Sequence, residues 1–97
     1  MKSSHMRELL STLSKPYSFE IITYCYSWPR NLNELSKYLE APYMTVKDRV
    51  ESLVKSDVLE VSDRVNPETN RLCTVYKTRN FSYTIDPEKI INLIKTA

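Results

Sequence analysis

The apolar residues in the first half of the chain recur three or four positions apart, which is the period of a helix buried on one side. Residues 6–14, "MRELLSTLS", place Leu9, Leu10 and Leu13 on one side of such a helix. Residues 17–28, "YSFEIITYCYSW", carry apolar side chains on more than one stripe, so we expect a second helix that is buried on most of its circumference. Trp28 should end it, because a residue that precedes proline is disfavoured in the helical region.

Two helices with a sharp break between them are expected next. Asn31 can cap the first helix, and Glu34 three residues later completes a capping box. Pro42 suits an early position of the second helix, residues 42–55. The inward positions are Leu32, Leu35 and Leu39 in the first helix and Val46, Val50 and Leu53 in the second, whose outer side holds Met44, Lys47, Asp48, Glu51 and Lys55. This pattern is typical of a helix-turn-helix, whose second helix commonly enters the DNA major groove.

The period changes to that of strands after residue 57. Residues 58–65, "VLEVSDRV", alternate as a half-buried strand with Leu59, Val61 and Val65 inside. Residues 66–70 read as a turn. Residues 71–79 and 81–85 read as a returning strand with an irregular segment or bulge at 77–80. A last helix starts at Asp86 and Pro87, with Ile90, Ile91 and Ile94 on its apolar side.

Length and charge limit the organisation of the chain. Its 97 residues suit one domain, which we place at residues 6–97, with residues 1–5 as a probable cloning remnant. The formal charge of +2 alone does not indicate a partner, but residues 64–79 carry four basic side chains against one acidic side chain. No apolar run approaches the roughly 20 residues of a membrane span. We therefore expect a cytoplasmic protein with no membrane contact.

The side-chain inventory argues against catalysis. His5, the only histidine, lies in the expected remnant, so the usual general base is missing. The two cysteines, Cys25 and Cys73, are far apart, and we expect buried thiols in a reducing compartment rather than a metal site. A glycine-rich phosphate loop is impossible without glycine. We therefore expect no enzyme, no metal and no cofactor.

The order of these elements resembles the ArsR-like branch of bacterial and archaeal transcription regulators, from about Leu13 to Ile94. The segments that carry the resemblance are "LNELSKYLEAPYMTVKDRVESLVKSDVLEV" and "YTIDPEKIINLI". The resemblance implies a mainly α fold with a β-hairpin wing, an α+β winged helix-turn-helix. Asp57 stands where the family usually has a glycine, and the family's metal-binding cysteine motif is absent, so metal sensing is not carried over. MarR-like and viral or archaeal winged-helix regulators are neighbouring possibilities.

We expect sequence-specific binding of double-stranded DNA, as a repressor, through the helix 42–55 and a basic wing at about 58–79. Asp48 is more simply a solvated charge, Asn31 more simply a cap than a phosphate ligand, and Met44 and Tyr43 could equally cover the core. The expected DNA contacts are Tyr43, Thr45, Lys47, Arg49 and Lys55 on the helix and Arg64, Asn70 and Arg71 on the wing.

The terminal helices are expected to join two copies into a homodimer. A single winged helix reads only a few base pairs, and two-fold pairing doubles the contacts. In the resembled family the terminal helices form the dimer contact. The expected interface residues are Leu9, Leu10, Leu13, Ile90, Ile91 and Ile94. The alternative function is a winged-helix protein–protein interaction module of a larger assembly that does not read DNA.

Overall fold

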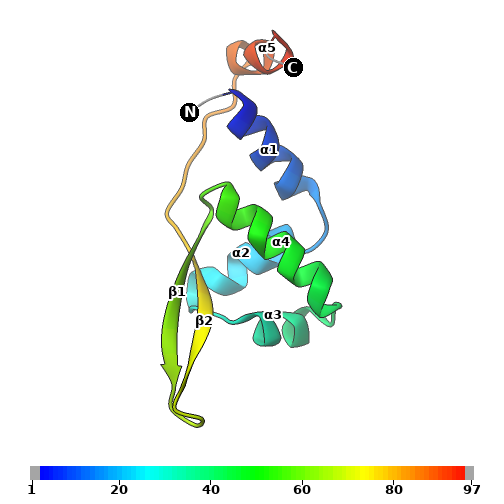
Figure 1. Ribbon diagram of the computed structural model, residues 1–97. Helices are drawn as coiled ribbons and strands as arrows, with labels where there is room; N and C mark the ends of the chain where they lie inside the picture. The colour runs from blue at the N-terminus through cyan, green and yellow to red at the C-terminus, as the bar shows by residue number, and fades with distance from the viewer. Residues whose placement is uncertain (1–2, 96–97) are drawn as a thin grey trace.

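The structure is a computed structural model that describes residues 3–95, which form five helices and one β-hairpin (Figure 1). α3 and α4 are the helix-turn-helix and the hairpin follows them as the wing, so the expected α+β winged-helix fold is confirmed. The elements are α1 (Ser3–Ser14), α2 (Ser18–Ser27), α3 (Leu32–Leu39), α4 (Tyr43–Lys55), β1 (Leu59–Asn66), β2 (Arg71–Thr78) and α5 (Pro87–Lys95).

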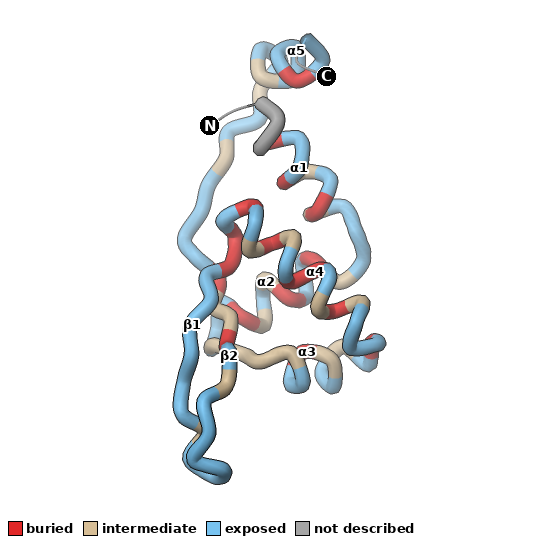
Figure 2. The backbone as a smooth tube through the Cα atoms, in the orientation of Figure 1, coloured by how far each residue is buried: buried red, intermediate tan, exposed pale blue. Residues whose placement is uncertain are grey.

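The hydrophobic core lies where α2, α3 and α4 meet the base of the hairpin, and Figure 2 shows buried positions concentrated there. Burial of these aliphatic side chains is the main term that stabilises the fold, at about 1.5–3 kcal/mol for each. The inward positions expected on α3 and α4 are confirmed, with Leu32 and Leu39 partly rather than fully buried. The fully buried side chains include Ile21, Cys25, Leu35, Val46, Val50, Leu53, Val58 and Leu59.

Local hydrogen bonds account for the angle between α3 and α4. The expected capping box is present: the Glu34 backbone N–H donates to Asn31 Oδ1 at 2.8 Å, and the Asn31 N–H donates to Glu34 Oε1 at 3.1 Å. α3 stops at Glu40, whose φ of 52° is left-handed. Ala41 N–H then donates to the Ser36 carbonyl at 3.1 Å, which closes the turn. Asp57 takes a φ of 60° after α4, so aspartate fills a position that commonly takes glycine.

The wing is a regular antiparallel hairpin. Its pairing runs from Leu59 opposite Thr78 to Asn66 opposite Arg71. The predicted continuation of the strand at 81–85 is wrong, and the pairing is regular as far as Thr78. The Arg79 N–H still donates to the Val58 carbonyl at 2.9 Å, and residues 80–86 then run as a connection to α5, because the chain before Val58 turns into α4 (Figure 1). A bridge between Arg30 and Tyr76 ties the hairpin to the start of α3.

Two burial expectations are wrong for one physical reason. The outer side of α2 is exposed at Phe19, Tyr26 and Trp28, although the sequence predicted burial around most of this helix. Val61 and Val65 of β1 are exposed as well, although the alternation placed them inside. A chain of this length has too few elements to cover the back of α2, and the outer half of the hairpin projects beyond the core (Figure 2).

α5 lies against α1 at one end of the molecule, and α1 also packs on α2 and α4 (Figure 1). α1 sends Leu9 into the core, which corrects its expected place in a dimer contact, while Leu10 and Leu13 are half-buried. α5 packs on α1 through Leu93, and its first turn is capped by Asp86 as expected. Residues 3–5 of the expected cloning remnant continue α1, and residues 1–2 lie outside the described part of the chain. The origin of this segment stays a prediction.

The two thiols should react very differently. Burial raises the pKa of Cys25 to about 12, with a smaller rise from Glu34, whereas Arg30 and Lys77 act in the opposite direction. Cys73 is only half-buried on the wing. Since the thiolate is the reactive form, we expect Cys25 in the native protein to react with a disulfide reagent at pH 8 at least ~100-fold more slowly than Cys73.

The measurement is the release of chromophore from native and denatured protein. We expect one rapid equivalent in the native state and a second on denaturation. Cys73→Ser should remove the rapid phase and Cys25→Ser should keep it. A rapid phase that survives in Cys73→Ser would show that the core around Cys25 is open to solvent.

Candidate nucleic-acid interface

The outer face of α4 is the first part of the candidate interface. Its inner face is held in the core by Val46, Val50 and Leu53, which leaves the opposite side to solvent. Tyr43, Met44 and Lys55 are exposed on that side, and Thr45 and Lys47 are half-buried. Hydroxyl and ammonium groups on the first turns of such a helix can donate to base edges or to phosphates.

Arg49 is the expected DNA contact that the structure places elsewhere. Its side chain is only 8% exposed, and its Nε donates to the carbonyl of Pro16 at 2.9 Å. Its guanidinium also lies 3.8 Å from the exposed carboxylate of Asp48. Arg49 falls on the inner side of α4, next to Val50, and fastens the connection between α1 and α2. Its spacing of three from Val46 and four before Leu53 belongs to the inner stripe, and only its charge had suggested the outer side.

The wing carries the second part of the candidate interface. Arg64, Asn70 and Arg71 are all exposed, and Asn70 closes the turn with a φ of 55°. The pairing of Arg64 with Cys73 and of Asn66 with Arg71 places both arginines on one face of the hairpin, since alternate residues share a face. The other face shows the apolar side chains of Val61, Val65 and Leu72. The wing therefore has a basic face and an apolar face.

Tyr76 of β2 connects the two parts, and the sequence did not single it out. It lines a cavity of about 310 Å³ with Tyr43 and Cys73, and another of about 280 Å³ with Glu51 and Lys55. Burial raises the pKa of Tyr76, and Glu51 and Tyr43 add to the rise. Residues at both ends of α4, Tyr43 and Lys55, thus line cavities that Tyr76 also borders. An aromatic residue in a regular strand has no sequence signal that would have distinguished it.

Arg30 holds the start of α3 against β2, and it was not among the site residues expected from the sequence. Its guanidinium lies 3.9 Å from the centre of the Tyr24 ring, which stacks on Tyr38 with ring centres 3.8 Å apart. It also lies 3.7 Å from the Glu34 carboxylate. These contacts hold the residue that pairs with Tyr76 and so fix the start of α3 against the hairpin. The sequence signal was an arginine directly after Trp28 and Pro29.

No group of three or more histidine, cysteine, aspartate or glutamate side chains in the described part of the chain is arranged to hold a metal ion. Among residues 3–95, no helix combines the length and the apolar character that crossing a bilayer requires.

Comparison with known proteins bears on the fold. No protein-family model matches the chain, and no curated protein matches it. Among solved structures, the chain is similar to a protein from Methanosarcina mazei Go1 described as a possible transcriptional regulator. That similarity has a TM-score of 0.57 at 18% sequence identity and covers 94% of this chain and 73% of the other. At this identity the likeness concerns the fold, and the chain therefore shares the fold of a protein described as a possible regulator of transcription.

Proposed function

We propose that the protein binds double-stranded DNA in a sequence-specific manner and regulates transcription, as a repressor. The observation that carries the proposal is the placement of α4. Its apolar side is locked in the core, while Tyr43, Thr45, Lys47 and Lys55 lie on the outer side beside a long wing. A helix held in this way can enter the major groove without losing its own packing. Arg64, Asn70 and Arg71 would then contact the backbone or the minor groove.

The proposal includes the ArsR-like subtype and a cytoplasmic location, where DNA is accessible to a bacterial or archaeal regulator. It assigns no catalytic role to the chain and requires no metal or cofactor. Its main support is the order of elements from α1 to α5, with the helix-turn-helix and wing between two terminal helices.

We also propose that the working form is a homodimer joined through α1 and α5. α5 is attached to its own chain through the buried Leu93 and a hydrogen bond of 2.6 Å from Arg7 to the Leu93 carbonyl. Ile90, Ile91 and Ile94 remain exposed, with Ile94 at 68%. Three exposed isoleucines on one short helix form an apolar surface that monomeric proteins usually cover. Leu10, half-buried on α1, extends this surface.

Loss of Lys47 tests the DNA surface. We expect Lys47→Ala to weaken binding to a selected operator by about 1–3 kcal/mol if it contacts a base, and to relax the preference at that position. The operator would come from selection on random duplexes, and affinity would be measured by gel shift over a series of salt concentrations. Lys95→Ala is the matched control, because it removes the same charge at the far end of the molecule (Figure 1). If Lys47→Ala and Arg71→Ala both leave the affinity and its salt dependence at the control value, the assigned surface is wrong.

A second function has one observation in its favour. Phe19, Tyr26, Trp28 and Tyr38 are exposed on α2, at its end and on α3, on elements that the proposed DNA contacts do not use. Exposed aromatic side chains are enriched in protein interfaces. A winged-helix interaction module would use this surface and would give no salt-dependent gel shift with any duplex. The same experiment therefore separates the two functions.

A further inference from the structure

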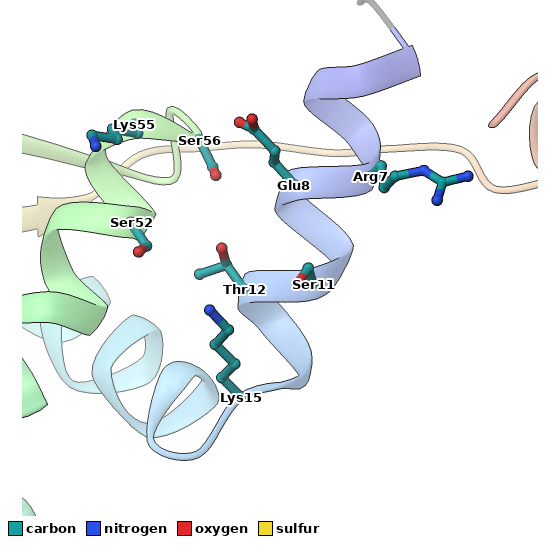
Figure 3. A pocket seen from close by; sticks show the side chains of 8 residues that line it. All are labelled: Arg7, Glu8, Ser11, Thr12, Lys15, Ser52, Lys55 and Ser56. Carbon is teal, nitrogen blue, oxygen red and sulfur yellow. The ribbon is translucent and has the colours of Figure 1, made fainter. Parts of the chain in front are cut away.

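A cavity of about 400 Å³ that is bordered by polar and charged residues lies between α1 and the C-terminal end of α4 (Figure 3). Its volume falls in the range of small-molecule sites, roughly 300–1,000 Å³. The side chains that matter here come from α1 and the residue after its end (Glu8, Ser11, Thr12 and Lys15) and from α4 and its end (Ser52 and Ser56).

Two polar helix faces build this cavity. Glu8, Ser11 and Thr12 of α1 recur at i, i+3 and i+4, and Lys15 follows directly after the helix end. Ser52 and Ser56 are four positions apart, so each helix contributes one polar stripe. Helices that pack together in globular proteins usually meet through apolar stripes. α1 does have such a stripe, since Leu9 and Leu13 pack on the core. The polar stripe beside it is not needed for that packing.

Two buried hydroxyl groups in the cavity have no protein partner. Thr12 is 6% exposed and Ser56 is 2% exposed. Figure 3 shows both side chains turned into the space between the two helices. No described residue forms a hydrogen bond with either hydroxyl, although the backbone carbonyl of Thr12 accepts one from Ser18. Buried hydroxyls in folded proteins nearly always have a protein or water partner, so these two are hydrogen-bonding groups that a molecule between the helices could use.

The charges of the cavity are separated. Figure 3 shows the Glu8 carboxylate on the side of Ser56 and the Lys15 ammonium below Thr12 and Ser52. Within the described chain, neither Glu8 nor Lys15 forms an ion pair with another side chain. Arg7 and Lys55, which also border the cavity, turn outward, and Arg7 donates to the Leu93 carbonyl. The space between the helices therefore meets a negative group at one end, a positive group at the other and hydroxyls between them.

We propose that this cavity binds a small zwitterion of the ω-amino acid class, whose ammonium and carboxylate stand at opposite ends of a short carbon chain, because Glu8 and Lys15 are seven residues apart, roughly 10 Å along a helix. Glu8 accepts hydrogen bonds from the ammonium of the ligand, and Lys15 donates to its carboxylate. The hydroxyls of Thr12, Ser52 and Ser56 complete the polar contacts. Charge-assisted hydrogen bonds at both ends make the ligand's charge pattern the basis of selection. A simple anion meets repulsion from Glu8, and a simple cation meets repulsion from Lys15.

Such a ligand would act on DNA binding, a consequence that rests on the proposed function. Ser52 belongs to α4, the proposed DNA-reading helix, and Ser56 ends it, whereas α1 belongs to the proposed dimer contact. A molecule held by both helices sets the position of α4 relative to the dimer. A ligand that binds one such position better than another shifts the population of DNA-binding protein.

Thermal unfolding of the full chain without DNA tests binding. Straight-chain ω-amino acids of increasing length would be added singly at about 10 mM, because a ligand that binds only the folded state raises the midpoint by an amount that grows with its concentration relative to its dissociation constant. We expect at least one to raise the midpoint, and the same compound with its amine acetylated or its carboxylate amidated to have no effect. Inorganic phosphate at equal concentration should also have none. A phosphate effect without an amino acid effect, equal effects of the blocked compounds, or no effect of any amino acid would each overturn the proposal.

Three variants locate the site. Glu8→Gln and Lys15→Gln should each weaken the binding of the active amino acid at least tenfold by calorimetry, and Glu20→Gln, on α2, is the matched control. Ser56→Ala should weaken binding without lowering the midpoint of the free protein, because its hydroxyl has no partner to lose. Unchanged affinity in all three would overturn the assignment. Amino acid binding without any DNA binding would support the proposed ligand of the cavity and overturn the proposed function. DNA binding without any amino acid binding would overturn the proposed ligand and support the proposed function.

Discussion

The double variant Ile91→Glu, Ile94→Glu is expected to give a folded monomer that binds its operator about 100- to 1,000-fold more weakly than the wild type. The physical reason is the loss of linkage between two DNA-reading units, since joining two binding modules commonly gains 10²–10⁴ in affinity. Ile91 and Ile94 are both exposed on α5, so the substitutions leave no cavity in the monomer. Carboxylates placed on the two-fold contact would meet their own copies and repel them.

Sedimentation at tens of micromolar measures the oligomeric state, and gel shift on a palindromic operator measures the DNA affinity. The matched control is Phe19→Glu, which places the same charge on an exposed apolar position of α2, away from α5. This control should stay dimeric with nearly wild-type affinity. A wild type that already sediments as a monomer at these concentrations would remove the dimer and leave a protein that acts at a single site.

Arg49→Ala is expected to destabilise the fold by about 2–3 kcal/mol and to leave the DNA affinity of the folded protein within about twofold of the wild type. The substitution removes the hydrogen bond from Arg49 Nε to the Pro16 carbonyl and leaves that carbonyl without its charged donor. It also removes the packed stem of a side chain that is 8% exposed. The contact with Asp48 contributes little, because that carboxylate is mostly exposed.

Urea unfolding measures the stability, and gel shift at a temperature where the variant is folded measures the affinity. Lys47→Ala is the complementary variant on the same helix, for which we expect the opposite result: weaker DNA binding at nearly unchanged stability. If Arg49→Ala weakens DNA binding as Lys47→Ala does and unfolds like the wild type, then Arg49 turns outward in solution and the original expectation from the sequence stands.

The helices and their ends were predictable because their signals are local. Asn31 and Glu34 form the expected capping box, and Asp86 caps the last helix as expected. The inward positions of α3 and α4 could be read from spacing, since a helix repeats its faces every three or four residues. The break at Ala41 and Pro42 likewise follows from residues that are close in sequence.

Burial at the edges of the fold was not predictable in the same way. The apolar period of α2 was read correctly as a helix, but Phe19 and Trp28 are exposed because no other element lies over them. Val61 and Val65 alternate as in a half-buried strand, yet they stand on the part of the hairpin that extends past the core. Leu9 and Leu10 are neighbours on one helix with different surroundings, since only Leu9 reaches the core.

In the candidate sites, too, the local features could be predicted from the sequence and the contacts between distant segments could not. Sequence alone determined which residues form the helix-turn-helix and wing, because capping, turn chemistry and periodicity act within a few residues of the chain. Only the tertiary structure decided that Arg49 holds the α1–α2 connection, that Tyr76 borders cavities together with Tyr43 and Lys55 of α4, and that Glu8 and Ser56 share a cavity. Each of these facts depends on which faces of distant segments meet. That choice is made by the burial of the whole core, to which every element contributes, and no short stretch of sequence contains it.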